Sequence, residues 1–377
     1  MSYKIVLFHT IGGLGLFIFG MRMMSESLQR AAGERLRKIL EKASSNRVVA
    51  CITGTVTTAL IQSSSATTVM LVGFVNAGLL NLSQAVGVAL GANIGTTVTA
   101  QMIAFKITDA ALPAIAVGAG LCIFGKKRST VELGGVILGF GLLFFGLVVM
   151  KMGVAPLKDS QVILDFFTRF QADNIGGILL CVLTGAVATI LLQSSSATVG
   201  LTMTLATQGL ISFPGAVALI LGENIGTTIT AELASIGTDY NSKRTARAHT
   251  MFNVLGVSYM VIFFPLFISL VTWATSTFLG LESVDLVIDG EKPNINRYIA
   301  NAHTMFNVVN AMIFLSLLPL LLKAATALTA SPKTEEDLDI LKPKYLDKQF
   351  LDMPPVALQQ ARQEMIRMGD IAEGMML

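Results

Sequence analysis

The chain has 377 residues, of which 53% are hydrophobic and only 14% are charged, and its mean hydropathy is +0.68. Soluble proteins carry about 25% charged residues, so this composition excludes an ordinary soluble domain and predicts an integral membrane protein with several spans. The net charge is only +3, and the basic residues gather in short segments between apolar runs. That pattern sets orientation in a membrane and gives no support to nucleic-acid binding.

Successive apolar runs predict an all-α fold. Two of them, at about 48–80 and 176–210, contain polar interruptions, and we interpret them as re-entrant helical hairpins whose broken backbone lines a site. The other predicted spans are 5–24, 84–105, 107–124, 134–150, 213–236, 251–278 and 299–322. The basic segments are 126–128, 243–247 and 30–47, the last of which is expected to form an interfacial amphipathic helix.

The interruption of the first hairpin is repeated in the second. Gln62–Thr67 reads Gln-Ser-Ser-Ser-Ala-Thr, and the same hexapeptide returns 131 residues later as Gln193–Thr198. The same offset relates Gly91–Thr97 to Gly222–Thr228, which are two copies of Gly-x-Asn-Ile-Gly-Thr-Thr. Because one offset joins two separate motifs, the chain contains a duplication.

The charge pattern predicts that the two copies are inverted. If the basic segments are cytoplasmic and each hairpin returns to its own side, three crossings precede the second copy and the N-terminus lies outside. Leu14–Gly20 and Phe140–Gly146 align loosely as the first spans of the two copies. Inverted repeats with a site near the midplane are typical of secondary transporters. The predicted parts are an inverted repeat at 1–128, a second at 129–278, an extracellular loop at 279–298, a final span at 299–322 and a cytoplasmic tail at 323–377.

The two hairpin tips have the chemistry of an ion site. Backbone N–H groups that open the second helix of each hairpin, together with the serine hydroxyls, suit an anion. Carbonyls at the end of the preceding helix suit a small hard cation such as Na⁺. Side-chain oxygens for that cation are offered by Gln62 and Thr67 at one tip and by Gln193 and Thr198 at the other.

The paired Gly-x-Asn-Ile-Gly-Thr-Thr motifs predict two broken helices that converge with the tips on one cavity, because their glycines weaken a helix. Glu223 is the only carboxylate in these motifs, and its counterpart is Ala92. An intramembrane carboxylate is a functional candidate, with proton carriage, cation binding and simple exposure to the cavity as its possible roles. Further oxygens and donors are offered by Asn93, Thr96, Thr97, Asn224, Thr227 and Thr228.

These polar residues could also stabilise helix packing instead of binding an ion, and both interpretations stay open. Ser/Thr patches in membrane helices also make plain interhelical hydrogen bonds, and Asn93 and Asn224 could orient the backbone instead of touching a ligand. Ala248–Asn253 and Ala302–Asn307 share the sequence Ala-His-Thr-Met-Phe-Asn. We interpret this pair as helix starts whose polar groups cap and join helices, because no metal-ligand or nucleophilic set surrounds the two histidines.

Neither hairpin tip nor either Gly-x-Asn motif contains a lysine or arginine. A bound dianion would then have no fixed cationic partner in a medium of low dielectric constant, so cations that bind with it are the expected source of neutralisation. This absence favours cation-coupled anion symport. An enzyme is not expected, since no activated nucleophile or metal cluster is visible.

Taken together, these motifs resemble the type II sodium/phosphate cotransporter family over about residues 5–322. The resemblance implies Na⁺-coupled uptake of inorganic phosphate across a plasma membrane, with Na⁺ as coupling ion and no organic cofactor. It places phosphate and Na⁺ at Ser63, Ser64, Ser194 and Ser195, with support for Na⁺ from the tip glutamines and threonines. The full expected phosphate set is Ser63, Ser64, Ser65, Ser194, Ser195, Ser196, Asn93 and Asn224. The full expected Na⁺ set is Gln62, Ser63, Thr67, Thr96, Thr97, Gln193, Ser194, Thr198, Thr227 and Thr228, with Glu223 as a weaker member.

The resemblance also bears on location and on the tail. The long extracellular loop of the animal members is absent, which favours a bacterial inner membrane. The 346–376 segment has an amphipathic helical pattern and resembles the start of a PhoU-like helical domain. Two other functions remain: Na⁺-coupled symport of another small anion, a carboxylate or sulfate, and a membrane phosphate sensor whose tail signals. The oligomeric state is left open.

Overall fold

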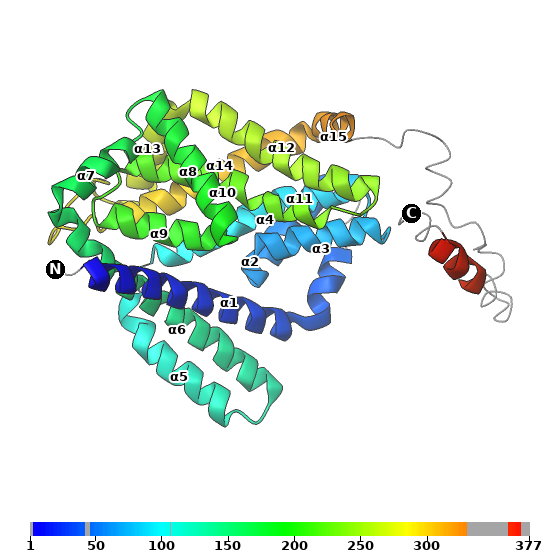
Figure 1. Ribbon diagram of the computed structural model, residues 1–377, viewed down its shortest axis with the longest axis horizontal. Coiled ribbons are helices and arrows are strands. Elements are labelled where there is room, and N and C mark those ends of the chain that lie inside the picture. The colour runs from blue at the N-terminus through cyan, green and yellow to red at the C-terminus, as the bar shows by residue number, and fades with distance from the viewer. Residues whose placement is uncertain (1–2, 42–45, 106, 330–360, 371–377) are drawn as a thin grey trace. The chain divides into compact units, whose positions relative to one another are not determined.

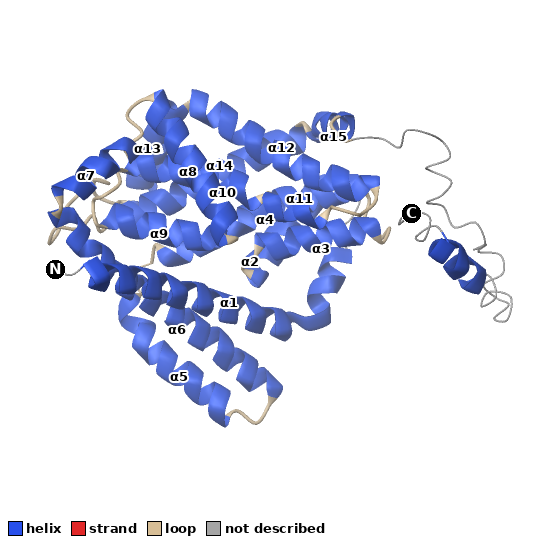
Figure 2. Ribbon diagram, in the orientation of Figure 1, coloured by secondary structure: helices blue, strands red, loops and turns tan. Residues whose placement is uncertain are grey.

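The structure is a computed structural model that describes residues 3–41, 46–105, 107–329 and 361–370. It divides into a unit at 1–329 and a unit at 330–377, of which the second is described only as a helix at 361–370. Most of the predicted amphipathic tail segment therefore lies outside the described residues. In the first unit the described residues form helices, and β pairing among them is confined to one bridge between Ile288 and Glu291 (Figures 1 and 2).

The helices confirm the predicted all-α membrane class. Four helical stretches are long and apolar enough to cross a membrane, and up to six are if each of two bent pairs counts as one span. The helices of the first unit are α1 (Tyr3–Glu41), α2 (Arg47–Ile61), α3 (Ser64–Asn76), α4 (Leu82–Ile103), α5 (Ala111–Phe124), α6 (Arg128–Val154), α7 (Gln161–Phe167), α8 (Ile175–Leu192), α9 (Ser195–Thr207), α10 (Phe213–Thr227), α11 (Ile229–Ala234), α12 (Tyr240–Ile262), α13 (Phe264–Leu279), α14 (Ile295–Ser316) and α15 (Leu318–Ala327), with short 3-10 turns at Thr108–Ala110, Ala155–Asp159 and Thr168–Phe170.

Helices α1 and α6 pack against each other in antiparallel directions (Figure 1). A Cβ added at Gly13 would lie 2.4 Å from the Met150 nitrogen, and one at Gly20 would lie 2.5 Å from the Leu143 nitrogen. Only glycine permits backbones to approach this closely, as is common between membrane helices. The expected separate helix at 30–47 is wrong in its first part, because α1 continues without a break to Glu41. Residues 42–45 and the side chains of 32–41 lie outside the described residues.

Both interrupted runs form helical pairs, α2–α3 and α8–α9, which confirms the predicted breaks. In each half the next long helix runs parallel to the first arm of the hairpin. A Cβ at Gly91 of α4 would lie 1.8 Å from the Cys51 oxygen of α2, and a Cβ at Gly222 of α10 would lie 1.8 Å from the Val182 oxygen of α8. The two copies therefore share one local architecture. Their orientation in a membrane stays a prediction.

The predicted break at the first Gly-x-Asn motif is wrong. Helix α4 runs unbroken through Gly91–Thr97, because its glycines serve close packing on α2 and its hydroxyls bond within the helix. The hydroxyl of Thr96 donates to the Ala92 carbonyl and that of Thr97 to the Ile94 carbonyl. In the second copy an interruption does occur, at Thr228 between α10 and α11.

The last two predicted spans are bent, not straight. Helices α12 and α13 meet at 88°, and α14 and α15 meet at 82°. Pro265 and Pro319 stand in the first turn of the second helix of each pair. A proline is tolerated there because the first turn of a helix does not use its N–H groups, but its ring prevents one helix from continuing straight through this point. These prolines are 54 residues apart, like His249 and His303. The two histidine motifs lie inside α12 and α14, so the interpretation of them as helix starts is wrong.

We expect Gly91→Ala to destabilise the protein by about 1–3 kcal/mol, because its new methyl group would collide with a backbone oxygen of α2. Gly73→Ala in α3 is the matched control, since a Cβ there meets nothing within 4 Å and alanine favours a helix. Thermal unfolding of both variants in detergent measures the difference. Equal midpoints would contradict the close packing of α2 on α4.

Candidate binding site between the hairpin tips

The first tip is a single residue in the left-handed conformation followed by a serine cap. Gln62 has φ 57° and ψ 28°, and its N–H donates to the Thr58 carbonyl at 2.7 Å, which ends α2. Ser63 is extended, and its Oγ accepts from the Ala66 N–H at 3.2 Å. A serine in this position replaces one of the hydrogen bonds that the first helical turn lacks. The chain therefore reverses within two residues and opens α3 at Ser64.

The second tip has the same geometry. Gln193 has φ 49° and ψ 28°, and the Ser194 Oγ accepts from the Ala197 N–H at 3.2 Å. A buried hydroxyl pair joins the arms of each hairpin: Thr58 with Thr67 and Thr189 with Thr198, both at 3.0 Å. The threonines at 67 and 198, expected at Na⁺ sites, thus hold the two arms together.

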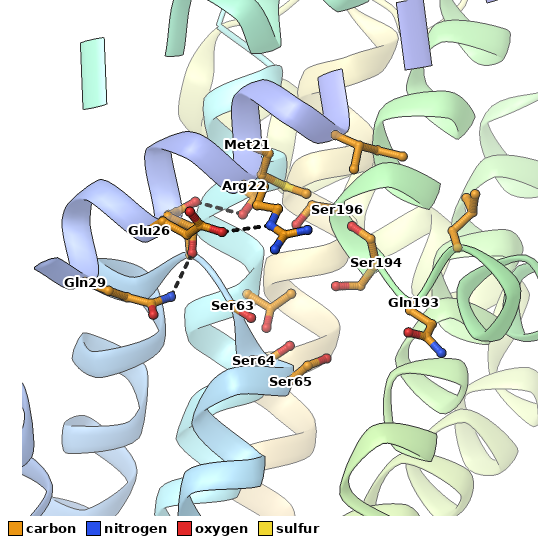
Figure 3. A pocket seen from close by; sticks show the side chains of 17 residues that line it. Met21, Arg22, Glu26, Gln29, Ser63, Ser64, Ser65, Gln193, Ser194 and Ser196 are labelled. Atoms are coloured by element: carbon orange, nitrogen blue, oxygen red, sulfur yellow. Dashed lines mark hydrogen bonds and ion pairs between the residues drawn. The ribbon is translucent and has the colours of Figure 1, made fainter. Parts of the chain in front are cut away.

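Both tips line one cavity of about 380 Å³ (Figure 3). The N-termini of α3 and α9 therefore converge on the same space, where their unpaired N–H groups and helix dipoles favour an anion. Figure 3 shows the serines of both tips around this space, with α1 across it. Among the predicted site residues, those that line the cavity are Gln62, Ser63, Ser64, Ser65, Thr96, Gln193, Ser194, Ser195 and Ser196.

Helix α1 contributes charged residues that the sequence interpretation missed. Arg22 and Glu26 line the cavity, and the Arg22 Nε donates to the Glu26 carboxylate at 2.8 Å. The expectation that the site has no nearby cationic side chain is therefore wrong, because the cation comes from α1 and not from the tips. The available indication was a charged residue, Arg22, inside the predicted span 5–24, with Glu26 four residues further on.

Polar contacts fix α1 to the first tip. The buried Ser25 Oγ donates to the Ile61 carbonyl, the last of α2, and the Gln29 amide donates to the Ser25 Oγ at 3.1 Å. On the other side of the tip, the Thr99 hydroxyl donates to the Gln62 Oε1 at 2.9 Å. The Gln62 side chain, expected at a Na⁺ site, is thus held by α4 at the edge of the cavity.

The remaining predicted residues do not line this cavity. Asn93 bonds to α12 instead: its amide donates to the Asn253 Oδ1 at 2.6 Å, and its Oδ1 lies 2.9 Å from the His249 Nε2. Asn224 donates to the Ile220 carbonyl of its own helix at 2.8 Å. For these two asparagines, the alternative that they position helices fits the structure better than direct contact with the anion. The others outside the cavity lining are Thr67, Thr97, Thr198, Glu223, Thr227 and Thr228.

Some buried polar atoms have no partner: the Glu223 Oε2, both ring nitrogens of His303 and the Asn307 Oδ1 make no hydrogen bond among the described residues. In the other Ala-His-Thr-Met-Phe-Asn motif, His249 and Asn253 form the network with Asn93. The two motifs therefore share a sequence but differ in their polar contacts.

Comparisons with known proteins assign the chain to a family. The model of the Na⁺/Pi-cotransporter family matches residues 16–152 and 162–283, and the chain belongs to that family. The predicted resemblance is confirmed, and the family is one of transporters, not of enzymes.

Relatives cover the chain to different extents. A protein of Escherichia coli, provisionally named the inorganic phosphate export protein YjbB, is 32% identical over 99% of this chain. The chain spans 64% of the length of that relative. YqeW of Bacillus subtilis, an uncharacterised protein, is 31% identical over 80% of this chain and 91% of its own length. The rat sodium-dependent phosphate transport protein 2A is 36% identical over 25% of this chain and 15% of its own. No solved structure matches.

The tip geometry predicts a difference between two truncations of Gln193. Both Gln193→Gly and Gln193→Ala remove the side chain, but the left-handed conformation costs alanine about 1–2 kcal/mol and glycine almost nothing. The glycine variant should therefore unfold at the higher temperature in detergent. The same pair of substitutions at Gln208, which has φ −79°, should show no such advantage for glycine. A more stable alanine variant at position 193 would contradict the left-handed tip.

Proposed function

We propose that this protein carries inorganic phosphate across the bacterial inner membrane together with Na⁺, and that the cavity between the hairpin tips holds the phosphate. The observation that carries this proposal is the convergence of two serine-capped helix N-termini on one cavity. Family membership supports phosphate transport. The phosphate ligands are the tip serines, Ser63–Ser65 and Ser194–Ser196, with backbone N–H groups of the first turns of α3 and α9.

Sodium ions bind beside the phosphate in this proposal. The carbonyl ends of α2 and α8 and the side-chain oxygens of Gln62, Gln193 and Thr96 offer oxygen ligands at the cavity edge. Thr67, Thr97, Thr198, Thr227, Thr228 and Glu223 would act in a second layer or at separate ion positions. A phosphate dianion needs about two positive charges to remain in a site of low dielectric constant. Arg22 supplies one at most, so the argument for accompanying cations still holds.

The two halves are proposed to be inverted repeats that expose the cavity alternately to the two sides. The antiparallel packing of α1 on α6 supports this, because these helices contain the aligned segments Leu14–Gly20 and Phe140–Gly146. Under the positive-inside rule the N-terminus is outside and the tail is cytoplasmic. Inverted repeats give alternating access when one part rocks against the other.

Direction follows from the driving gradient. Symport with Na⁺ moving inward is uptake, which we favour. Export is the second candidate, since the Escherichia coli relative is named for it, and it would require another driving force than the inward Na⁺ gradient. Symport of a carboxylate or sulfate and a purely sensory role are further outcomes that the following experiments separate.

Radiolabelled phosphate should accumulate in proteoliposomes that contain the full chain when an inward Na⁺ gradient is applied. Replacing Na⁺ by choline should remove the accumulation, because the cations that neutralise the bound phosphate would be missing. Excess arsenate should compete, whereas citrate and sulfate should not. Equal uptake in the two media would overturn Na⁺ coupling, and competition by citrate or sulfate alone would overturn the choice of phosphate.

Ser64→Ala and Ser195→Ala should each lower the ratio of maximal rate to half-saturating phosphate concentration by roughly 10- to 100-fold. A hydrogen bond to a charged group contributes about 1.5–3 kcal/mol. Ser258→Ala is the control, because Ser258 is exposed on α12 and bonds only to the Val254 carbonyl of its own helix. Membrane yields of all three should match the wild type. Unchanged kinetics in both tip variants would rule out the serines as phosphate ligands.

A further inference from the structure

A second cavity, also of about 380 Å³, lies beside the α1–α6 pair. The tip cavity is lined by α1 and the second cavity by α6. Its wall on α6 is formed by Phe144, Leu147, Val148 and Lys151. Helix α9 contributes Thr207, the segment before α14 contributes Glu291, and the 3-10 turn at Thr108–Ala110 contributes a second carboxylate, Asp109. Neither Lys151 nor Glu291 has a role in the tip site.

The two cavities are lined by equivalent faces of the two aligned helices. The α1 residues that line the tip cavity include Ile18, Met21, Arg22 and Ser25. Adding 126, the offset that aligns Leu14–Gly20 with Phe140–Gly146, gives the four α6 residues of the second cavity. Equivalent faces of α1 and α6 therefore each line a cavity.

The antiparallel packing separates the two cavities along the α1–α6 pair. A Cβ at Gly153 of α6 would lie 2.6 Å from the Thr10 nitrogen of α1, so Lys151 stands beside the N-terminal part of α1. Arg22 is twelve residues beyond Thr10, which corresponds to roughly 18 Å, and it lies beside the middle of α6, because a Cβ at Gly20 would lie 2.5 Å from the Leu143 nitrogen. Between them, the buried Phe17 contacts Gly200 of α9: a Cβ at Gly200 would lie 2.9 Å from its ring.

Each cavity contains a basic side chain engaged by a carboxylate. In the tip cavity Arg22 contacts Glu26 at 2.8 Å, and in the second cavity the Lys151 Nζ lies 2.6 Å from the Glu291 Oε2. Glu291 also accepts from the Gln208 amide at 3.0 Å. Burial raises the pKa of Glu291, but the hydrogen bonds from Lys151 and Gln208 outweigh it and hold the pKa below its usual range. Glu291 is therefore charged at neutral pH.

We propose that the second cavity is an anion subsite at one mouth of the transport path, between the tip cavity and one membrane face, in which phosphate displaces Glu291 from Lys151 as it displaces Glu26 from Arg22 at the tip cavity. This inference rests on the proposed function. Both ion pairs are partly exposed, with side chains 46% and 28% accessible for Lys151 and Glu291. Such pairs contribute about 1 kcal/mol or less. A phosphate dianion, with more charge and more acceptor oxygens than a carboxylate, can replace either carboxylate.

The two cations differ in a way that fits a central site and an entrance of one path. Arginine presents a planar fork of donors to phosphate, whereas lysine acts as a point charge. Beside Lys151, the Thr207 hydroxyl donates to the Asn296 Oδ1 at 2.9 Å, and both residues line the cavity. The Asn296 amide is thus available as a second donor for an anion held by Lys151.

The experiment measures half-saturating phosphate separately at the two membrane faces. Sealed right-side-out and inside-out vesicles that contain the full chain are given radiolabelled inorganic phosphate at constant Na⁺. Arg22→Gln should raise the half-saturating concentration about fivefold or more at both faces, because the tip cavity opens to each side in turn, whereas Lys151→Gln should do so at one face only. Lys158→Gln is the matched control, since Lys158 bonds to the Gly290 carbonyl close to Glu291 but does not line the cavity.

Two further variants separate anion binding from structure. Lys151→Arg should restore the wild-type value, because it keeps the positive charge. Glu291→Gln should lower the half-saturating concentration at the same face, because it removes the competing carboxylate, whereas a structural salt bridge would make this variant resemble Lys151→Gln. An effect of Lys151→Gln at neither face, or of equal size at both faces, would overturn the inference. If the wild-type protein does not transport phosphate in these vesicles, the proposed function is overturned instead.

Discussion

A helix break within an apolar environment leaves backbone groups that must find partners, and this constraint organises the protein. At Gln62 and Gln193 the chain takes the left-handed conformation, and the next serine caps a new helix. The remaining N–H groups of that helix have no partner in the chain's own ladder and face a cavity. Two such breaks meet at one cavity, where the free backbone N–H groups and the serine hydroxyls have the chemistry that suits an anion.

Close packing keeps the tips in position. Glycines of α4 and α10 let these helices lie almost in backbone contact with the first arms of the hairpins. Threonine pairs then join the two arms of each hairpin near its tip. The tips are short reversals on rigid helices, and their geometry agrees closely between the copies, with Ser63 and Ser194 sharing a φ of −150°.

The antiparallel packing of α1 on α6 separates the equivalent faces of these two helices along one interface. Arg22 and Lys151 occur at neighbouring positions on those equivalent faces, and each is held by an acidic residue from a different source: Glu26 from the same helix and Glu291 from the segment before α14. Similar helix faces thus line two chemically distinct cavities.

The amino-acid sequence by itself determined the class, the duplication and the positions of the hairpin breaks. These features depend on composition and on contacts within a few residues, such as the serine caps at Ser63 and Ser194. Pro265 and Pro319 were also local indications of the bends, although the apolar runs around them favoured straight spans. The tertiary structure alone decided that α1 brings Arg22 to the tips, that Asn93 binds α12 and that α4 continues through its glycines. Those outcomes depend on which helix faces meet, and a neighbour that is distant in the chain, such as Asn253 160 residues from Asn93, leaves no periodic pattern in the segment that it contacts.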